Sequence, residues 1–114
     1  MAHSVIHFEI SGPDGDRLTS FYRDLFGWSI SGAGPGYWLI QQADGGIGGG
    51  VMQGGGEIPP YVTVYVSTDD LDASLKRAVE LGGEVVVKET SIPGMGSFAM
   101  FRDPAGNVIG LFKE

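Results

Sequence analysis

The sequence predicts an α+β fold made of two βαβββ modules in one chain, with one helix packed behind each mixed sheet. Three observations support this prediction. Residues 5–10 alternate between apolar and polar side chains, which is typical of a half-buried strand. Apolar residues between positions 18 and 26 recur at helical spacing. The same order of elements then returns 56 to 60 residues later, so we expect two half-sheets that curl into a cup.

The first module continues from the strand into a turn at residues 11–15 and then into a helix. The apolar positions of this helix are Leu18, Phe21, Tyr22, Leu25 and Phe26. Gly27 is expected to end it, because glycine adopts the left-handed cap conformation easily. Three more strands are predicted at residues 28–30, 37–40 and 47–52. We place this module at about 4–53 and a linker at about 54–59.

The second module, at about 60–114, repeats the plan. Asp69 or Asp70 is a suitable N-cap for its helix, and Gly82 and Gly83 close that helix. Strands are predicted at residues 61–66, 84–89, 97–101 and 107–113. A loop rich in Pro, Gly and Met is predicted at 90–96.

Two shifts relate the two modules. A shift of 56 residues places His7 on Thr63, and a shift of 60 places Gly50 on Gly110 and Trp38 on Phe98. Few residues are identical between the two modules, so the inference of a repeat depends on the matching order and lengths of the elements. The alternative is that there is no repeat, because any small α+β protein can be divided into two halves with similar elements.

Composition excludes several classes of protein. A chain of 114 residues is the size of one domain, 1–114. The formal charge of −7 argues against nucleic acid and against an anionic membrane as partners. The absence of cysteine excludes disulfides, thiolate zinc sites and cysteine nucleophiles. Without a long apolar run or a secretory signal, the expected location is the cytoplasm.

Four segments carry a resemblance to a known family. They are Ile6–Ile10, Phe21–Trp28, Asp69–Ala73 running into Leu81–Gly83, and Phe101–Asn107 followed by Gly110–Phe112. Over essentially its whole length the chain resembles the vicinal oxygen chelate superfamily, which contains glyoxalase I, extradiol dioxygenases and bleomycin-resistance proteins. The resemblance implies paired βαβββ modules, the fold that the repeat already predicts. It also implies a homodimer.

In metal-dependent members, the resemblance implies one metal ligand from the first strand and one from the last strand of each module. These positions are His7, Thr63, Gly50 and Gly110 in this sequence. Only His7 is a competent ligand, because threonine is a poor neutral donor and glycine has no side chain. Glu9 shares the face of His7, but a catalytic metal site needs about three protein ligands. We therefore expect no cofactor, with a divalent metal as the less favoured alternative.

The two glycines at these ligand positions also suggest a roomy cup. If Gly50 and Gly110 lie where larger side chains otherwise stand, they leave space for a ligand. The alternation of side chains along each strand selects the residues that share a face with these glycines. The 90–96 loop, which is either a lid or a plain turn, adds Met95 to the predicted lining. The predicted ligand-binding residues are His7, Gly50, Met52, Thr63, Tyr65, Met95, Gly110 and Phe112. Glycine, methionine and aromatic residues suit a small apolar or aromatic molecule.

Two functions follow from this sequence. The first is a binding protein of the bleomycin-resistance type, which sequesters or recognises an apolar or aromatic ligand, as in antibiotic or natural-product resistance. The second is a lyase, isomerase or dioxygenase that uses His7 as a base or metal ligand, with Glu9 as the other catalytic candidate. A cup within one chain and a cup shared by two chains are both compatible with the sequence.

Overall fold

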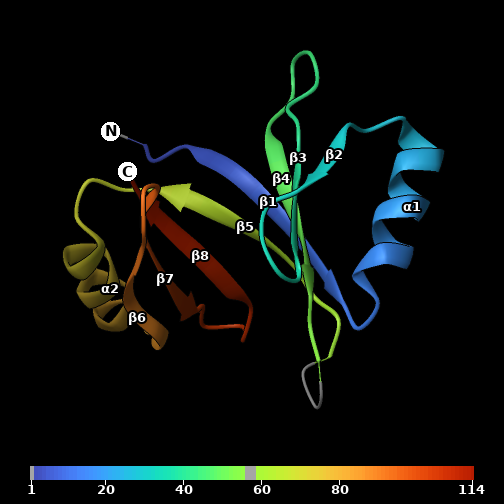
Figure 1. Ribbon diagram of the computed structural model, residues 1–114. Coiled ribbons are helices and arrows are strands. Elements are labelled where there is room, and N and C mark those ends of the chain that lie inside the picture. Colours follow the sequence, from blue (N-terminus) through green and yellow to red (C-terminus); the bar gives the residue numbers. More distant parts are fainter. Residues whose placement is uncertain (1, 56–58) are drawn as a thin grey trace. The chain divides into compact units, whose positions relative to one another are not determined.

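Two repeats of strand, helix and three strands make up the chain, as predicted (Figure 1). The computed structural model describes residues 2–55 and 59–114. It divides into a first unit, His7–Thr63, and a second unit, Met1–Ile6 with Val64–Glu114. The central part of the linker expected at 54–59 lies outside the described residues. Neither helix of the described chain has the length and apolar character needed to span a bilayer.

In the first unit, α1 packs on a four-stranded mixed sheet. Its elements are β1 (Val5–Gly12, of which the first two residues belong to the second unit), α1 (Gly15–Phe26), β2 (Ile30–Gly32), β3 (Tyr37–Ile40) and β4 (Gly48–Gln53). The strand order is β2-β3-β4-β1, and β1 and β4 are parallel. The helix begins where the Asp14 side chain accepts from the Arg17 amide at 3.1 Å. It ends at Gly27, whose φ of 69° is left-handed, as predicted.

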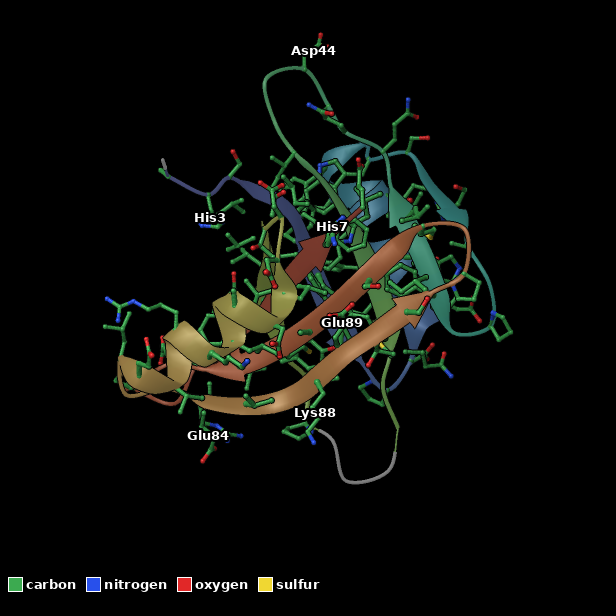
Figure 2. The ribbon with its side chains drawn as sticks, turned by 90° about the vertical axis from the view of Figure 1, so that its left-hand side faces the viewer. His3, His7, Asp44, Glu84, Lys88 and Glu89 are labelled. Carbon is green, nitrogen blue, oxygen red and sulfur yellow. The ribbon has the colours of Figure 1, made fainter. Side chains whose placement is uncertain are left out.

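In the second unit, α2 packs on an equivalent sheet. Its elements are β5 (Val62–Ser67, of which the first two residues belong to the first unit), α2 (Leu71–Glu80), β6 (Glu84–Ile92), β7 (Gly96–Arg102) and β8 (Val108–Lys113). The strand order is β5-β8-β7-β6, and β5 and β8 are parallel. Asp70 caps the helix by accepting from the Ala73 amide at 3.0 Å. Figure 2 shows the charged side chains Glu84, Lys88 and Glu89 on the edge strand β6, where charge disfavours pairing with another chain.

Each unit has its core between its helix and its sheet. The buried residues of the first core are Ile30, Ile40 and Val51, packed against Phe8, Leu18, Tyr22, Trp28 and Trp38. The buried residues of the second core are Leu71, Leu75, Ala99 and Leu111, packed against Val66 and Phe101. Both tryptophans therefore lie on the helix side of the first sheet.

Two segments differ from those expected. The second strand begins at Ile30 rather than at residue 28, because Trp28 packs into the core, where its ring stacks on that of Tyr22. The loop expected at 90–96 is a tight hairpin turn, because Ser91 pairs with Ser97 and the Met95 amide donates to the Ile92 carbonyl at 3.0 Å. Of the two expectations for this segment, a lid or a plain turn, its conformation agrees better with the plain turn.

The pairing registers also correct one position of the repeat. Trp38 pairs with Val51 in the first unit, and Ala99 pairs with Leu111 in the second. Since Val51 and Leu111 are counterparts, the counterpart of Trp38 is Ala99 and not Phe98. The strands β3 and β7 therefore correspond at a shift one residue larger than the shift of 60 that relates β4 and β8.

Candidate functional site

The helix-free face of the first unit carries the residues with the most chemistry. Glu9 pairs with Gly50 across β1 and β4, and Tyr37 pairs with Met52 across β3 and β4. Residues paired in this way share a face of the sheet. The predicted common face of His7 and Glu9 is thus confirmed, and Tyr37 shares it (His7 is labelled in Figure 2).

A hydrogen-bonded network joins these side chains. Glu9 is only 4% exposed. Its Oε1 accepts from the Tyr37 hydroxyl at 3.2 Å, and its Oε2 accepts from the Tyr61 hydroxyl at 2.7 Å. The Tyr37 oxygen also lies 3.0 Å from His7 Nε2. A buried carboxyl group is costly unless it is hydrogen-bonded, and here both of its oxygens have partners.

The network determines where the proton on His7 lies. The Tyr37 hydroxyl has a single hydrogen, which it donates to Glu9. Its oxygen must therefore accept from His7 Nε2, and Nε2 carries a proton. In the neutral imidazole the acceptor lone pair is then on Nδ1.

Burial tunes two of these groups. Desolvation lowers the pKa of His7 below 6.5, and the nearby Glu9 offsets part of this effect. Burial also raises the pKa of Tyr61, with the hydrogen bond to Glu9 acting in the same direction. Both shifts favour the neutral forms of the His7 imidazole and the Tyr61 phenol at neutral pH.

The space expected above the two glycines is filled, and this corrects the prediction of a glycine-widened cup. A β-carbon on Gly50 would lie 2.0 Å from the Tyr37 hydroxyl oxygen. A β-carbon on Gly110 would lie 2.4 Å from the ring of Tyr65. A tyrosine ring thus covers each glycine, which is a common way to protect a glycine in a sheet. The glycines seat aromatic rings and do not leave open volume.

The donor set does not fit a metal of the type found in the family. Among the described residues, no group of three or more His, Asp or Glu side chains is placed to hold a metal ion. The two oxygens of Glu9 accept from tyrosine hydroxyls, and Thr63, 4% exposed, stands where a second histidine would be needed.

The other predicted ligand residues divide between the units. Met52 lies on the helix-free face of the first unit, and its sulfur is 3.7 Å from the Tyr61 hydroxyl. On the helix-free face of the second unit, β-pairing brings together Tyr65, Gly110 and Phe112 with the additional residues Phe98 and Met100. Met95 is 56% exposed at the hairpin turn.

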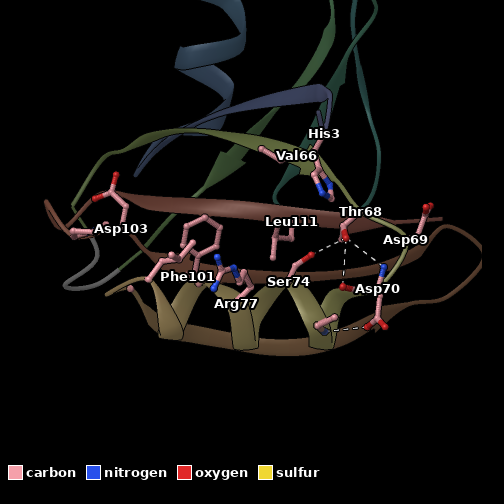
Figure 3. A pocket seen from close by; sticks show the side chains of 15 residues that line it. His3, Val66, Thr68, Asp69, Asp70, Ser74, Arg77, Phe101, Asp103 and Leu111 are labelled. Atoms are coloured by element: carbon pink, nitrogen blue, oxygen red, sulfur yellow. Dashed lines mark hydrogen bonds between the residues drawn. The ribbon is translucent and has the colours of Figure 1, made fainter. Parts of the chain in front are cut away.

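The second unit also has a groove that the sequence did not indicate. It has a volume of about 710 Å³ and lies along α2 (Figure 3). None of the predicted ligand-binding residues lines it.

Tyr37 and Tyr61 are site residues that the predicted ligand-binding set does not contain. Tyr61 is positioned by Ser11, whose amide donates to the Tyr61 carbonyl at 2.9 Å and whose hydroxyl accepts from the Tyr61 amide at 3.2 Å. The parity of 61–66 placed Tyr61 on one face, but no sequence signal linked it to Glu9. For Tyr37, the sequence did offer a signal: a tyrosine in a strand next to a glycine-rich strand can lay its ring over a glycine.

Comparisons with known proteins agree with the predicted fold. The family model "Glyoxalase/Bleomycin resistance protein/Dioxygenase superfamily" matches residues 4–111. Two similar relatives are an anthracycline biosynthesis protein DnrV of Streptomyces peucetius (32% identical) and an anthracycline biosynthesis protein DauV of Streptomyces sp. strain C5 (30% identical). Each match covers 94% of this chain. The chain spans about half the length of these relatives, since the matches cover 46% of each.

A solved structure of a methylmalonyl-CoA epimerase of Streptomyces coelicolor has the same fold. It is 18% identical with a TM-score of 0.71, and the match covers all of this chain and 96% of that one. The predicted arrangement of two βαβββ modules is therefore confirmed.

Proposed function

Because the chain belongs to the glyoxalase/bleomycin resistance protein/dioxygenase superfamily, we propose that it binds a small aromatic molecule on the helix-free face of its first unit. The polar contacts in this proposal come from His7 and Tyr37, with Glu9 and Tyr61 behind them. The observation that carries it is the buried carboxyl group of Glu9, which two tyrosine hydroxyls hold at 3.2 and 2.7 Å. Such a network fixes its members in place, and a rigid polar group within an apolar surface is typical of a ligand site.

The surface around the network supports an aromatic ligand. Leu39 and Met52 are partly exposed, at 39% and 43%, and flank Tyr37 on the same face. Apolar, methionine and tyrosine side chains together offer a flat contact for a ring system. Two relatives are named for the biosynthesis of anthracyclines, which are planar polycyclic compounds. We therefore propose a polycyclic aromatic ligand for this face.

Binding of doxorubicin, a soluble anthracycline, tests this proposal. Its own fluorescence is the readout, because Trp28 and Trp38 lie on the other face of the sheet and would report poorly. The His7→Ala and Tyr37→Phe variants should each weaken binding about tenfold, the effect of one lost hydrogen bond. The Gln41→Ala variant, at an exposed position of the same unit, is the matched control and should bind like the wild type. Equal binding by all four proteins, or no binding at all, would refute the proposal.

An enzyme with His7 as general base is the second candidate. The lowered pKa of His7 and the Tyr37–Glu9 pair behind its Nε2 favour this function. In such a reaction a substrate proton would pass to the neutral imidazole, and the Tyr37–Glu9 pair would stabilise the imidazolium formed. Deuterium uptake from solvent into a panel of α-hydroxyketones, seen with the wild type and lost in His7→Gln, would place this function first.

We also propose that the protein acts without a metal, as a cytoplasmic homodimer. The donor set around His7 supports the first part. Membership of this superfamily supports the homodimer. Sedimentation analysis tests the dimer. Stoichiometric metal in protein purified without chelator, and its loss in His7→Ala, would overturn the metal-free proposal.

A further inference from the structure

The groove of the second unit occupies a space that side chains fill in the first unit. The helix N-caps Asp14 and Asp70 fix the correspondence of α1 and α2 at a shift of 56 residues. The pairs Ile10↔Val51 and Val66↔Leu111 fix that of the sheets below them. Equivalent positions in the two units can thus be compared residue by residue.

Large residues of the first unit have small counterparts along the groove. Leu18 corresponds to Ser74, and Tyr22 corresponds to Ala78. In the first unit Tyr22 stacks on Trp28, with ring centroids 5.5 Å apart and an interplanar angle of 16°. In the second unit Ser74 and Ala78 line the groove of about 710 Å³ instead. The second unit thus has an open groove where the first unit has packed side chains.

Part of the lost volume is replaced from within the chain. Trp38 corresponds to Ala99, but Gly15, against which Trp38 packs, corresponds to the buried Leu71. This exchange fills the region near residue 71 and leaves the region around Ser74 and Ala78 open. The open part is the place where the first unit has its stacked pair of aromatic rings.

We propose that this groove is a second small-molecule site, which binds a planar aromatic molecule that is neutral or cationic. The stacked rings of the first unit show the shape that fits between helix and sheet. Figure 3 shows Phe101 and Leu111 on the sheet side, and Ser74 and Arg77 on the helix side. The volume is within the range of about 300–1,000 Å³ that is common for ligand sites.

The charged groups along the groove set the charge of the ligand. Three carboxylates line it, at Asp69, Asp70 and Asp103. The guanidinium group of Arg77 already forms a salt bridge with Glu80 at 3.2 Å. An anion would therefore meet net negative charge, whereas a cation would be attracted. Thr68 and Ser74, whose hydroxyl oxygens lie 2.7 Å apart, add hydrogen-bonding groups at one end.

A titration with proflavine, a planar cationic tricycle, tests the proposal by amide chemical shifts. We expect shifts at Ser74, Ala78 and Leu111, and little effect from the anionic tricycle anthraquinone-2-sulfonate. The Ala78→Tyr variant restores the residue of the first unit and should weaken proflavine binding at least tenfold. It should also raise the melting temperature, because it fills the groove. The Ala43→Tyr variant, which adds the same ring at an exposed position of the first unit, is the matched control.

Three outcomes would overturn the proposal. They are the absence of proflavine binding, shifts confined to the first unit, and unchanged binding by Ala78→Tyr. Concentration-dependent line broadening that Ala78→Tyr relieves would assign the groove to a second copy of the chain instead. If Ala78→Tyr fails to fold, as shown by loss of amide dispersion, Ser74→Leu makes the same test with a smaller side chain. Because the His7 network takes no part, failure here leaves the proposed function of the first unit untouched.

Discussion

The hydroxyl oxygen of Tyr37 lies 2.0 Å from the point that a β-carbon on Gly50 would occupy. Only glycine at this position lets the Tyr37 ring lie flat enough on the sheet to reach both Glu9 and His7. A residue that seemed to open a cavity is thus the seat of a site residue. The network therefore requires a residue without a side chain at position 50.

The Gly50→Ala variant should displace Tyr37 and lower the free energy of unfolding by about 2 kcal/mol, as overpacking of a buried site does. Urea unfolding measures the loss. In a Tyr37→Ala background the same change should be neutral or stabilising, because the clash is gone. The control is Gly32→Ala, since a β-carbon there meets nothing within 4 Å. Equal losses with and without Tyr37 would show that Gly50 does not act through Tyr37.

His7 should be a neutral imidazole with its proton on Nε2 at pH 7.5. The reason is that the Tyr37 hydroxyl donates to Glu9 and accepts from Nε2. Nitrogen chemical shifts of the ring distinguish the two tautomers. Tyr37→Phe should shift the population toward a mixture, while melting within a few degrees of the wild type would show that the fold is intact. A wild-type ring protonated on Nδ1 would contradict the proton arrangement.

Stability should fall as the pH drops from about 7 toward 5. The folded pKa of His7 is below the unfolded value of 6.5, so the unfolded chain takes up the proton first. Above the unfolded pKa this group costs nothing, and below it the cost grows until the folded group is also protonated. The His7→Gln variant should lose less stability over this range. An unchanged pH dependence in His7→Gln would show that His7 is not the group responsible.

Tyr61 should remain un-ionised at pH 11, because burial and the hydrogen bond to Glu9 raise its pKa. The chain has four tyrosines, so absorbance at 295 nm can follow their ionisation while circular dichroism checks the fold. Replacing Tyr61 with Phe should leave the absorbance change between pH 7 and 11 unaltered. A clear reduction in this change would mean that Tyr61 ionises with the others. Stability is fully present below the unfolded pKa of 10 and should fall as the pH rises above it.

Local patterns predicted most of the fold. The alternation at 5–10 placed His7 and Glu9 on one face, and Asp70 and Gly27 act as the caps that their residue types predict. These features depend on neighbours within a few positions along the chain. Short-range geometry therefore carried the prediction of elements and faces.

The site itself needed long-range registers that no local pattern contains. Glycines in a strand indicate either open space or a close approach, and only the pairing of β3 with β4 shows that Tyr37 lies over Gly50. The groove was hidden for a related reason. Trp38 aligned with Phe98 in the sequence, whereas strand pairing makes Ala99 its counterpart.

The most direct test of the proposed function is the location of a bound ligand. Aromatic carbon and proton shifts of a doxorubicin titration would be recorded for His7, Tyr37 and Tyr61 in the wild type. We predict that the signals of all three rings shift together along one saturation curve, with the His7 ring shifted most. Saturable binding that leaves the His7 and Tyr37 signals unmoved would contradict the assignment of this network as the ligand site.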